Sequence, residues 1–372
     1  MNKNIKKKIL HITVRADYGG GPEHVYQLIN QLNDKCVNFI ACPKERPYWN
    51  KYSDVVGEGN LIEIPHRKLS FSCLYKLIVY MKDNKIDIIH THGKGAGLYG
   101  RFLTLFAGIP SIHTPHGIHI GKYNAIMKRL YISYEYFFSR YIDKIIFVSP
   151  SEQSISEQYT IWPKSKHLVI LNGVCAVEKN QMIRANIRKL LGIGDDVQVV
   201  LSISRFDYQK NMQESLSVAK KMTHMMFIWV GDGSDRIALE GLCLKENINN
   251  IFFTGFVDNV KDYIAASDIV LSTSRWEGLS LGLLEAMSAG LPVVASDVTG
   301  NRDAVRHGYN GYLYPLGNIE QACSYLHRFN TPTVYREVSL NAKREYEQNF
   351  SVEVMAEKVE KVYQDVLDRK RY

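Results

Sequence analysis

Apolar residues recur along the chain in short continuous runs, each followed by a stretch with helical spacing. The run KILHITV spans residues 8–14, and the segment 22–32 then places Val25, Leu28 and Leu32 on one helical face. Runs that are apolar at every position are typical of parallel strands covered on both faces. The opening of the chain therefore predicts a strand and an amphipathic helix of an α/β sheet.

This alternation continues through the first 175 residues and then restarts. The first series predicts further strands at 36–42, 86–92, 111–116, 144–149 and 167–173. The second series predicts strands at 197–204, 226–231, 251–255, 268–274 and 291–296. The segment 172–186 between them is polar and poorly periodic, which is typical of a linker.

The two series predict two doubly wound α/β domains in tandem, residues 1–175 and 176–350. Residues 351–372 are expected to form a C-terminal helix that crosses back to the N-terminal domain. Sheets of this type bind ligands beyond the carboxyl ends of their strands. Two such domains are expected to face each other across a deep cleft, where ligand sites are common.

Composition agrees with a globular protein of the cytoplasm. The chain has 372 residues, 45% of them hydrophobic, and no apolar run approaches the roughly 20 residues that cross a membrane. The first apolar run ends at Val14 and is too short for a signal peptide. The six cysteines are scattered without a C-x-x-C pattern, as expected of reduced thiols.

The net charge of +8 is unevenly distributed. Residues 1–175 hold 23 Lys and Arg against 13 Asp and Glu, a balance of +10, whereas residues 176–372 hold 23 against 25, a balance of −2. A basic half suggests a polyanionic partner such as a phosphorylated substrate, an anionic membrane surface or nucleic acid. The alternative, an ordinary lysine-rich surface, stays open on charge alone.

Candidate chemistry follows several of the predicted strands. A glycine cluster at 19–21 comes after the first strand, where backbone N–H groups at a helix start suit an anion. Arg205 and Lys210 come after strand 197–204, and two cations there suit a diphosphate. Each feature alone is weak, because a tight turn explains the glycines and solvated surface cations explain the basic pair.

Two glutamates in SRWEGLSLGLLEAMSAGLPVVAS, residues 274–296, add to this pattern. Glu277 ends a predicted loop, and Glu285 lies in a helix expected to begin between Leu279 and Leu281. Eight helical positions rise about 12 Å, too far for an acid–base pair on one glycosidic bond. The glutamates could instead hold the two ends of one long ligand, with the helix start facing a phosphate between them.

Together these residues resemble the GT-B glycosyltransferases of the large retaining group 1 family, of the family 4 type. The resemblance is carried by Arg205 with Lys210 and by Glu277 with Glu285. The segments GGPEHV, HTPHG, SPSE, LNGV, VGDG and FTGFVDNV are also similar and occur in the family's order. The similarity covers nearly the whole chain and implies transfer of a hexose-type sugar from a nucleoside diphosphate sugar.

The resemblance also implies roles for individual residues. Arg205 and Lys210 would bind the donor diphosphate, Glu277 would hold the donor sugar, and Glu285 would bind the ribose. His116 would lie near the outer hydroxyl of the sugar, with His113 as a weaker candidate. The remaining donor contacts would come from Gly20, Gly21, Phe256, Gly278, Leu279, Ser280 and Leu281.

The family's chemistry implies no cofactor and no bound metal, because two cations and a helix end stabilise the leaving diphosphate. Histidines 113, 116 and 119 lack acidic or cysteine partners at convincing spacing, so no metal site is expected. One segment departs from the family pattern. Where many members read D-x-G-G-x-x-E, this chain reads DVTGNRD, with Thr299 and Asp303.

The acceptor is expected to be a glycan, with a lipid-linked one on undecaprenyl diphosphate favoured, and the donor a UDP-sugar. Residues 121–144 predict a helix that mixes aromatic and basic residues, which suits an anionic membrane surface. A helix packed on the first sheet with a solvated basic side is the alternative. Surface polysaccharide assembly (lipopolysaccharide, O-antigen or capsule) on the inner face of the cell membrane is the expected setting.

Other functions stay open. A non-hydrolysing sugar-nucleotide epimerase of similar fold would lack this combination of Arg, Lys and two Glu. A dinucleotide oxidoreductase is disfavoured because residues 19–24 read GGGPEH rather than G-x-G-x-x-G. A non-enzymatic basic binding protein rests on charge alone, and no recognised nucleic-acid module is present, so no nucleic-acid partner is expected.

Overall fold

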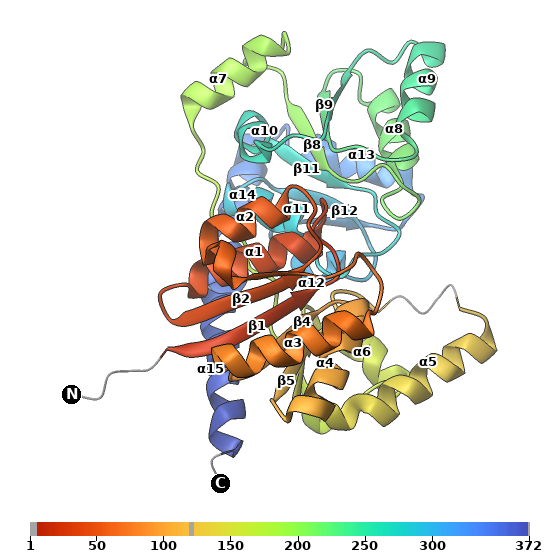
Figure 1. Ribbon diagram of the computed structural model, residues 1–372. Coiled ribbons are helices and arrows are strands. Elements are labelled where there is room, and N and C mark those ends of the chain that lie inside the picture. The colour runs from red at the N-terminus through yellow and green to blue at the C-terminus, as the bar shows by residue number, and fades with distance from the viewer. Residues whose placement is uncertain (1–5, 119–122, 371–372) are drawn as a thin grey trace. The chain divides into compact units, whose positions relative to one another are not determined.

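The computed structural model describes residues 6–118 and 123–370, and the chain divides into two compact units. Unit 1 consists of Met1–Gly173 together with Val352–Tyr372, and unit 2 is Val174–Ser351. Each unit is a parallel sheet flanked by helices (Figure 1).

Unit 1 contains a seven-stranded sheet in the order β3-β2-β1-β4-β5-β6-β7, with every neighbouring pair parallel. Its strands are β1 Lys7–Thr13, β2 Cys36–Cys42, β3 Leu61–Glu63, β4 Ile88–His92, β5 Ser111–Thr114, β6 Lys144–Phe147 and β7 His167–Val169. Its helices are α1 Gly20–Leu32, α2 Tyr48–Val56, α3 Phe71–Asn84, α4 Lys94–Ala107, α5 Ala125–Phe138, α6 Pro150–Gln158 and α15 Val352–Lys370.

Unit 2 contains a six-stranded parallel sheet in the order β10-β9-β8-β11-β12-β13. Its strands are β8 Val199–Ile203, β9 Met226–Val230, β10 Ile251–Gly255, β11 Ile269–Ser272, β12 Val293–Ser296 and β13 Gly311–Tyr314. Its helices are α7 Gln181–Leu190, α8 Met212–Lys221, α9 Arg236–Glu246, α10 Val260–Ala266, α11 Leu281–Ser288, α12 Asn301–Ala304, α13 Ile319–Arg328 and α14 Pro332–Glu345.

Both strand orders reverse direction beside the first strand of the unit, as in doubly wound nucleotide-binding folds. The reversal lies between β1 and β4 in unit 1 and between β8 and β11 in unit 2. The predicted α/β class with two doubly wound domains is therefore confirmed. Loops that leave these neighbouring strands on opposite sides create a natural crevice at the carboxyl ends.

The two faces of the sheet in unit 1 differ in chemistry. One face packs apolar residues such as Leu10 and Ile12 against Leu77 of α3 and Tyr99 of α4, all of them buried. The other face lies under α1 and α15, which contact each other. This second face carries an unusual number of buried polar side chains, among them His90, which hydrogen bonds to Tyr363 of α15.

Several elements differ from the sequence-based prediction. The strands β3 and β13 were not predicted, because β3 has only three residues and β13 has only three residues after Gly311. The segment predicted as a linker contains the start of α7, since Asn180 caps that helix by accepting hydrogen bonds from Met182 and Ile183 N–H groups.

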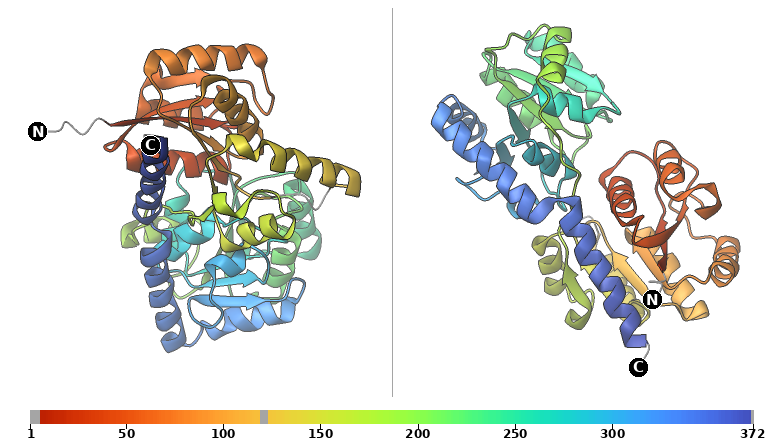
Figure 2. Two further views of the ribbon diagram at one scale, coloured as in Figure 1. Left: turned by 90° about the horizontal axis from the view of Figure 1, so that it is seen from below. Right: turned by 90° about the vertical axis from the view of Figure 1, so that its left-hand side faces the viewer.

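The helix predicted at 121–144 is shorter in the structure. Asn124 caps α5 by accepting a hydrogen bond from the Met127 N–H group, and Lys144 already belongs to β6. Residues 119–122, which include His119 and Lys122, lie outside the described residues. Figure 2 shows α5, in yellow, projecting from the sheet of unit 1.

Candidate functional site

A pocket opens in unit 2 where β8 and β11 end side by side, at the point where the strand order reverses. Its walls come from the ends of both strands, from the loops that follow them and from the start of α11. The lining residues include Ser204, Lys210, Ser272, Ser274, Glu277, Ser280 and Gly282. Three of the sequence-predicted donor residues, Lys210, Glu277 and Ser280, are thus brought together.

Lys210 and Glu277 form an ion pair inside this pocket. The Lys210 Nζ atom lies 2.5 Å from Glu277 Oε1, and the hydroxyl of Ser274 donates to the same oxygen at 2.6 Å. The side chains are 15% and 6% exposed, so the pair is largely shielded from water. A charge-assisted contact of this kind holds both groups in one geometry, ready for a ligand that competes for the ammonium.

Arg205 lies at the rim and does not line the pocket. Its side chain is 47% exposed and pairs with Asp207 at 3.1 Å. The loop that carries it is nevertheless tied to the loop after β11, because Gln209 donates to the Trp276 carbonyl and accepts from the Arg275 N–H group. The Arg205 guanidinium itself is held by its ion pair with Asp207, which a bound anion could replace.

The start of α11 completes the unit 2 site. Ser280 is the N-cap residue and offers no side-chain hydrogen bond, so the first N–H groups of the helix have no side-chain cap. A Cβ on Gly282 would lie 3.1 Å from Ile203, so the helix begins in close contact with the end of β8. Such a helix start favours an anion. The predicted start between Leu279 and Leu281 is confirmed at Leu281.

The other predicted donor residues of unit 2 lie in the loop after Glu277, in α11 and after β10. Gly278 and the buried Leu279 belong to the loop between Glu277 and the helix, and Leu281 begins α11. Glu285 lies in the second turn of α11, outside the pocket lining, and Phe256 follows β10 and is 52% exposed.

The segment DVTGNRD has a structural role beside Glu277, through a backbone carbonyl and through Gly300, which matches the family pattern. The Glu277 N–H group donates to the Thr299 carbonyl at 2.9 Å. Gly300 has a φ of 84°, and a Cβ there would lie 2.6 Å from the Glu277 backbone. Only glycine fits, so this segment positions Glu277 through its backbone.

In unit 1, the predicted residues lie at the ends of strands β1 and β5. Gly20 and Gly21 begin α1, and a Cβ on Gly21 would meet no atom within 4 Å. His116 follows β5 after Pro115 and has a positive φ of 56°, an uncommon conformation for a residue other than glycine. His113 lies in β5, where its Nδ1 atom hydrogen bonds to Thr91.

Sequence reasoning missed a cluster of buried histidines in unit 1. His24 of α1 gathers with His11, His90, His92 and His116. The available signal was a histidine in or just after several predicted strands. Parallel alignment brings such positions together, but spacing along the chain alone does not reveal which face they occupy.

Burial governs the ionisation of this cluster. It lowers the pKa of His11 and of His24 to about 4 each, although hydrogen bonds to Asn38 and Asn172 respectively raise them. It also holds the pKa values of His92 and His116 well below the ordinary histidine value, with neighbouring histidines adding to the effect. The rings are therefore neutral at physiological pH.

Two sets of these histidines bring their nitrogens close enough together to hold a cation. They are His11 with His90 and His92, and His24 with His92 and His116, and within each set the ligand atoms lie within 4.8 Å of one another. The expectation of no metal site had considered only histidines 113, 116 and 119. Most of the clustered nitrogens already hydrogen bond to neighbouring side chains, so we assign no ion to them.

The family follows from comparison with known proteins. Residues 18–176 match glycosyltransferase family 4, and residues 183–331 match the glycosyl transferases group 1 family. The chain therefore belongs to the group 1, family 4 type glycosyltransferases, as the sequence motifs predicted.

Relatives with curated names include two proteins of Escherichia coli. One is UDP-Gal:alpha-D-GlcNAc-diphosphoundecaprenol alpha-1,3-galactosyltransferase, 28% identical over 320 residues that cover 81% of this chain and 80% of the relative. The other is the O-antigen biosynthesis glycosyltransferase WbnH, 26% identical over 91% of this chain and 95% of the relative.

Solved structures confirm the predicted GT-B fold. Anabaena HepE in complex with UDP and glucose superposes with a TM-score of 0.85 at 18% identity, over 96% of this chain and 99% of that chain. Within the described residues, none of the helices has both the length and the apolar character needed to cross a membrane.

Proposed function

We propose that this protein transfers a hexose-type sugar from a UDP-sugar to a glycan acceptor in the assembly of a bacterial surface polysaccharide. The observation that carries the proposal is the Lys210–Glu277 pair at the strand-order reversal of unit 2, beside the start of α11. A cation, a carboxylate and a helix N-terminus suit a diphosphate and a sugar hydroxyl side by side. The names of the relatives support UDP as the nucleotide.

The proposed roles divide along the donor. Lys210 and Arg205 would bind the diphosphate and stabilise the charge that develops as it leaves, with the N–H groups of α11 assisting. Glu277 would accept hydrogen bonds from the sugar, and Glu285 from the ribose. Phe256 would lie near the base. Gly20, Gly21 and His116 would contribute from the N-terminal domain, with His116 near the outer hydroxyl of the sugar.

We further propose retention of the anomeric configuration and no requirement for a metal. The proposed diphosphate groups, Lys210 and Arg205, are cations already, and the α11 start adds a partial positive charge. A metal in this position would be repelled by the same groups in the absence of ligand. The proposal also assigns residues 176–350 to the donor and residues 1–175 to the acceptor.

The acceptor is proposed to be lipid-linked, as undecaprenyl diphosphate is in the name of one relative. Exposed apolar side chains on α5 support contact with a membrane surface. Ile126, Leu130 and Phe137, spaced by four and seven residues, are 73%, 60% and 55% exposed, and Arg129 and Arg140 are exposed beside them. The proposed location is cytoplasmic, peripheral on the inner face of the cell membrane.

Calorimetry with UDP, GDP and ADP, beside transfer assays with the corresponding sugars, tests the nucleotide. We expect UDP to bind, and the absence of binding by all three nucleotides would refute the donor assignment. A non-hydrolysing epimerase would instead interconvert the free UDP-sugar without acceptor, which the same assay detects.

Substitution of the two glutamates should have different effects on UDP affinity and on turnover. Glu285→Ala should weaken binding of UDP itself, because a ribose contact exists in nucleotide and donor alike. Glu277→Ala should leave UDP affinity nearly intact and lower turnover, because its partner is the sugar. Equal loss of UDP affinity in both variants would contradict this division of roles.

A further inference from the structure

A continuous chain of hydrogen bonds runs through unit 1 from Asn38 to His116. Strand register places its members on one face of the sheet, since Ile9 aligns with Asn38 in β2 and His11 aligns with His90 in β4. His11 Nε2 lies 3.2 Å from Asn38 Oδ1, His11 Nδ1 lies 3.1 Å from His92 Nε2, and His92 Nδ1 lies 3.3 Å from His116 Nε2.

The ring geometry identifies these contacts as hydrogen bonds in the ring planes. The centroids of His11 and His92 are 5.4 Å apart with planes 20° from parallel, and those of His92 and His116 are 5.6 Å apart at 23°. In both pairs the centroid separation exceeds the N···N distance by about the radii of two imidazole rings. The rings therefore meet nitrogen to nitrogen along a nearly straight line.

Asn38 determines which nitrogen donates in each of these hydrogen bonds. Its Nδ2 atom lies 3.4 Å from the Ile29 carbonyl oxygen, which can only accept a hydrogen bond. The amide nitrogen must therefore face Ile29, and the amide oxygen must face His11. Because that oxygen is also only an acceptor, the proton of His11 has to lie on Nε2.

The remaining protons follow from neutrality. A neutral imidazole has one donor and one acceptor nitrogen, and burial keeps His11, His92 and His116 neutral. His11 Nδ1 is then an acceptor that needs a proton on His92 Nε2. His92 Nδ1 is in turn an acceptor that needs a proton on His116 Nε2.

We propose that Asn38, His11 and His92 act as positioning residues that hold His116 in the tautomer with its proton on Nε2 and its Nδ1 atom as an acceptor. A group that binds His116 at Nδ1 must then bring an O–H or N–H. Resting on the proposed function, this favours a donor sugar that presents a hydroxyl there and disfavours one that presents a carboxylate.

Neighbouring groups do not impose this order. His24 packs its ring edge-on to His116 at a centroid distance of 4.5 Å, and the His24 Nδ1 atom has no hydrogen-bond partner among the described residues. His90 bonds to the hydroxyls of Tyr363 and Thr114, which can donate or accept and so fix no tautomer. His90 therefore supplies a control in the same polar layer.

The test is a long-range ¹H–¹⁵N correlation spectrum of the full chain with ¹⁵N-labelled histidine, at pH 7.5. His116 is assigned from the spectrum of His116→Gln. We expect His116 to be protonated at Nε2 with a preference of about tenfold or more over Nδ1. If all three histidines took the opposite tautomer, the Asn38 oxygen would have no hydrogen-bond donor. Protonation at Nδ1 in the wild type would overturn the proposal without any further variant.

Asn38→Leu removes the amide that fixes the proton of His11 on Nε2. His11→Phe removes the next hydrogen-bonding group, which contacts His92. Either should convert His116 to a mixture of tautomers, whereas Tyr363→Phe, which removes one hydrogen bond from His90, should leave His116 unchanged. The thermal midpoint of each variant separates a tautomer change from loss of folding. A response to Tyr363→Phe as large as that to Asn38→Leu would overturn the assigned role of Asn38.

A kinetic comparison separates this proposal from the proposed function. Asn38→Leu should raise KM for the UDP-sugar about threefold or more while leaving the Kd of UDP alone unchanged, because only the sugar would meet His116. An unchanged KM together with a changed tautomer would refute the link to the sugar. Absence of UDP binding in the wild type would count against the donor assignment and leave the tautomer result standing.

Discussion

Single residues in unit 2 set the position of the carboxylate at the centre of the site. Glu277 is held by its side-chain contacts to Lys210 and Ser274 and by its backbone contact to Thr299. The close approach of Gly300 leaves no room for movement on that side. Lys210, Ser274 and Thr299 lie in three different loops, so the position of the Glu277 carboxylate depends on three segments of the chain.

The first prediction concerns Gly300. Its φ of 84° and the 2.6 Å approach to Glu277 mean that Gly300→Ala should displace Glu277 and lower transfer by about tenfold or more. Gly308 is the matched control, since its φ is 77° but no atom lies within 4 Å of its Cβ position. Gly308→Ala should cost about 1–2 kcal/mol of backbone strain with transfer retained. Equal loss of transfer in the two variants would show that strain alone matters.

The second prediction concerns the cations. Arg205→Ala and Lys210→Ala should each lower transfer by about tenfold or more, because a charge-assisted hydrogen bond contributes about 1.5–3 kcal/mol. Lys210→Ala should also reduce stability, since it leaves the buried Glu277 without its ammonium partner. Lys220→Ala is the control, because Lys220 makes a 2.7 Å pair with Glu246 at an exposed site. Urea unfolding and transfer rates give both readouts, and near-wild-type turnover in both site variants would refute the assignment.

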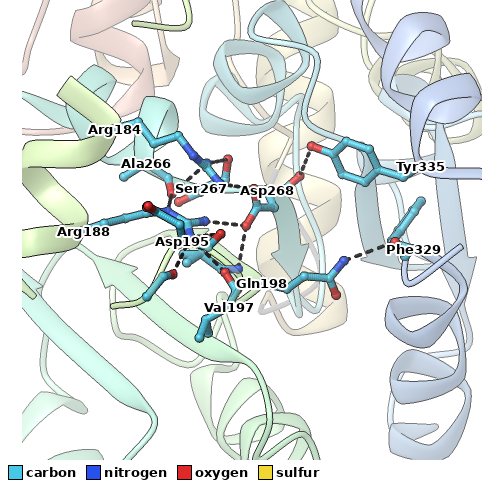
Figure 3. Close-up of polar contacts among 12 residues, drawn as sticks. Arg184, Arg188, Asp195, Val197, Gln198, Ala266, Ser267, Asp268, Phe329 and Tyr335 are labelled. Carbon is cyan, nitrogen blue, oxygen red and sulfur yellow. Dashed lines mark hydrogen bonds and ion pairs between the residues drawn. The ribbon is translucent and has the colours of Figure 1, made fainter. Parts of the chain in front are cut away.

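At the scale of elements, α7 is fastened to unit 2 by a network around Asp268 (Figure 3). The buried Arg188 pairs with Asp268 at 2.7 Å and donates to the carbonyls of Ala266 and Val197. Asp268 also pairs with Arg184 at 2.8 Å and accepts from the Val199 N–H group. The helix that the sequence failed to predict is therefore held mainly by buried polar contacts.

The third prediction follows from this network. Arg188→Met should destabilise the protein by about 1–3 kcal/mol for each partly buried carbonyl that loses its donor, here those of Gly194 and Val197, while Arg184 still pairs with Asp268. Arg184→Met should cost clearly less, since the Arg184 side chain is 26% exposed and Arg188 still neutralises Asp268. Denaturant unfolding measures both. A larger effect at Arg184 than at Arg188 would contradict the assigned anchor.

The fourth prediction concerns α5. One side packs Tyr131 and Ile132 against the cluster around Ile142, and the opposite side exposes Ile126 and Leu130. The packed helix expected as an alternative therefore describes one side of α5, and contact with a membrane surface stays a proposal for the other side. An exposed apolar stripe with basic neighbours is typical of interfacial helices.

We expect Arg129→Glu to weaken binding to anionic vesicles, since a basic residue near such a surface contributes about 1 kcal/mol. Lys128 and Arg140 are left unchanged because their charged groups lie 3.7 Å and 3.8 Å from the centroids of the Tyr159 and Phe137 rings, and reversal would disturb packing. Lys82→Glu on the exposed side of α3 is the charge control. Wild-type protein that fails to sediment with phosphatidylserine vesicles at low salt would refute the membrane contact.

At the scale of the whole molecule, activity should not depend on an added metal. The fifth prediction is that transfer survives EDTA, because the proposed diphosphate groups are side-chain cations and a helix start. Loss of activity that Mg²⁺ or Mn²⁺ restores would refute this. Loss restored by Zn²⁺ alone would instead point to the histidine sets in unit 1. His24→Gln would test the set of His24, His92 and His116, because His24 takes no part in the hydrogen bonds that link Asn38 to His116.

The alternation of strands and helices could be predicted from the sequence, because parallel strands that are buried on both faces need continuous apolar runs. The run at 36–42 predicted β2 to the residue, and 251–255 did the same for β10. The edge strands β3 and β13 were missed because their apolar runs are short, whereas the edge strand β7 lies in a longer apolar run. The missed α7 begins after the Asn180 cap and carries Ile183, Ile187 and Leu190 at helical spacing, so both local signals were present in the sequence.

The sequence by itself determined the fold class and the residue types of the proposed donor site, because these depend on periodicity and on chemistry at the ends of strands. Only the tertiary structure decided which of those residues share a pocket, since Lys210 and Glu277 meet 67 positions apart through the neighbouring ends of β8 and β11. It also decided the order of protons at His116. That order depends on strand register and amide orientation, which no spacing along the chain encodes.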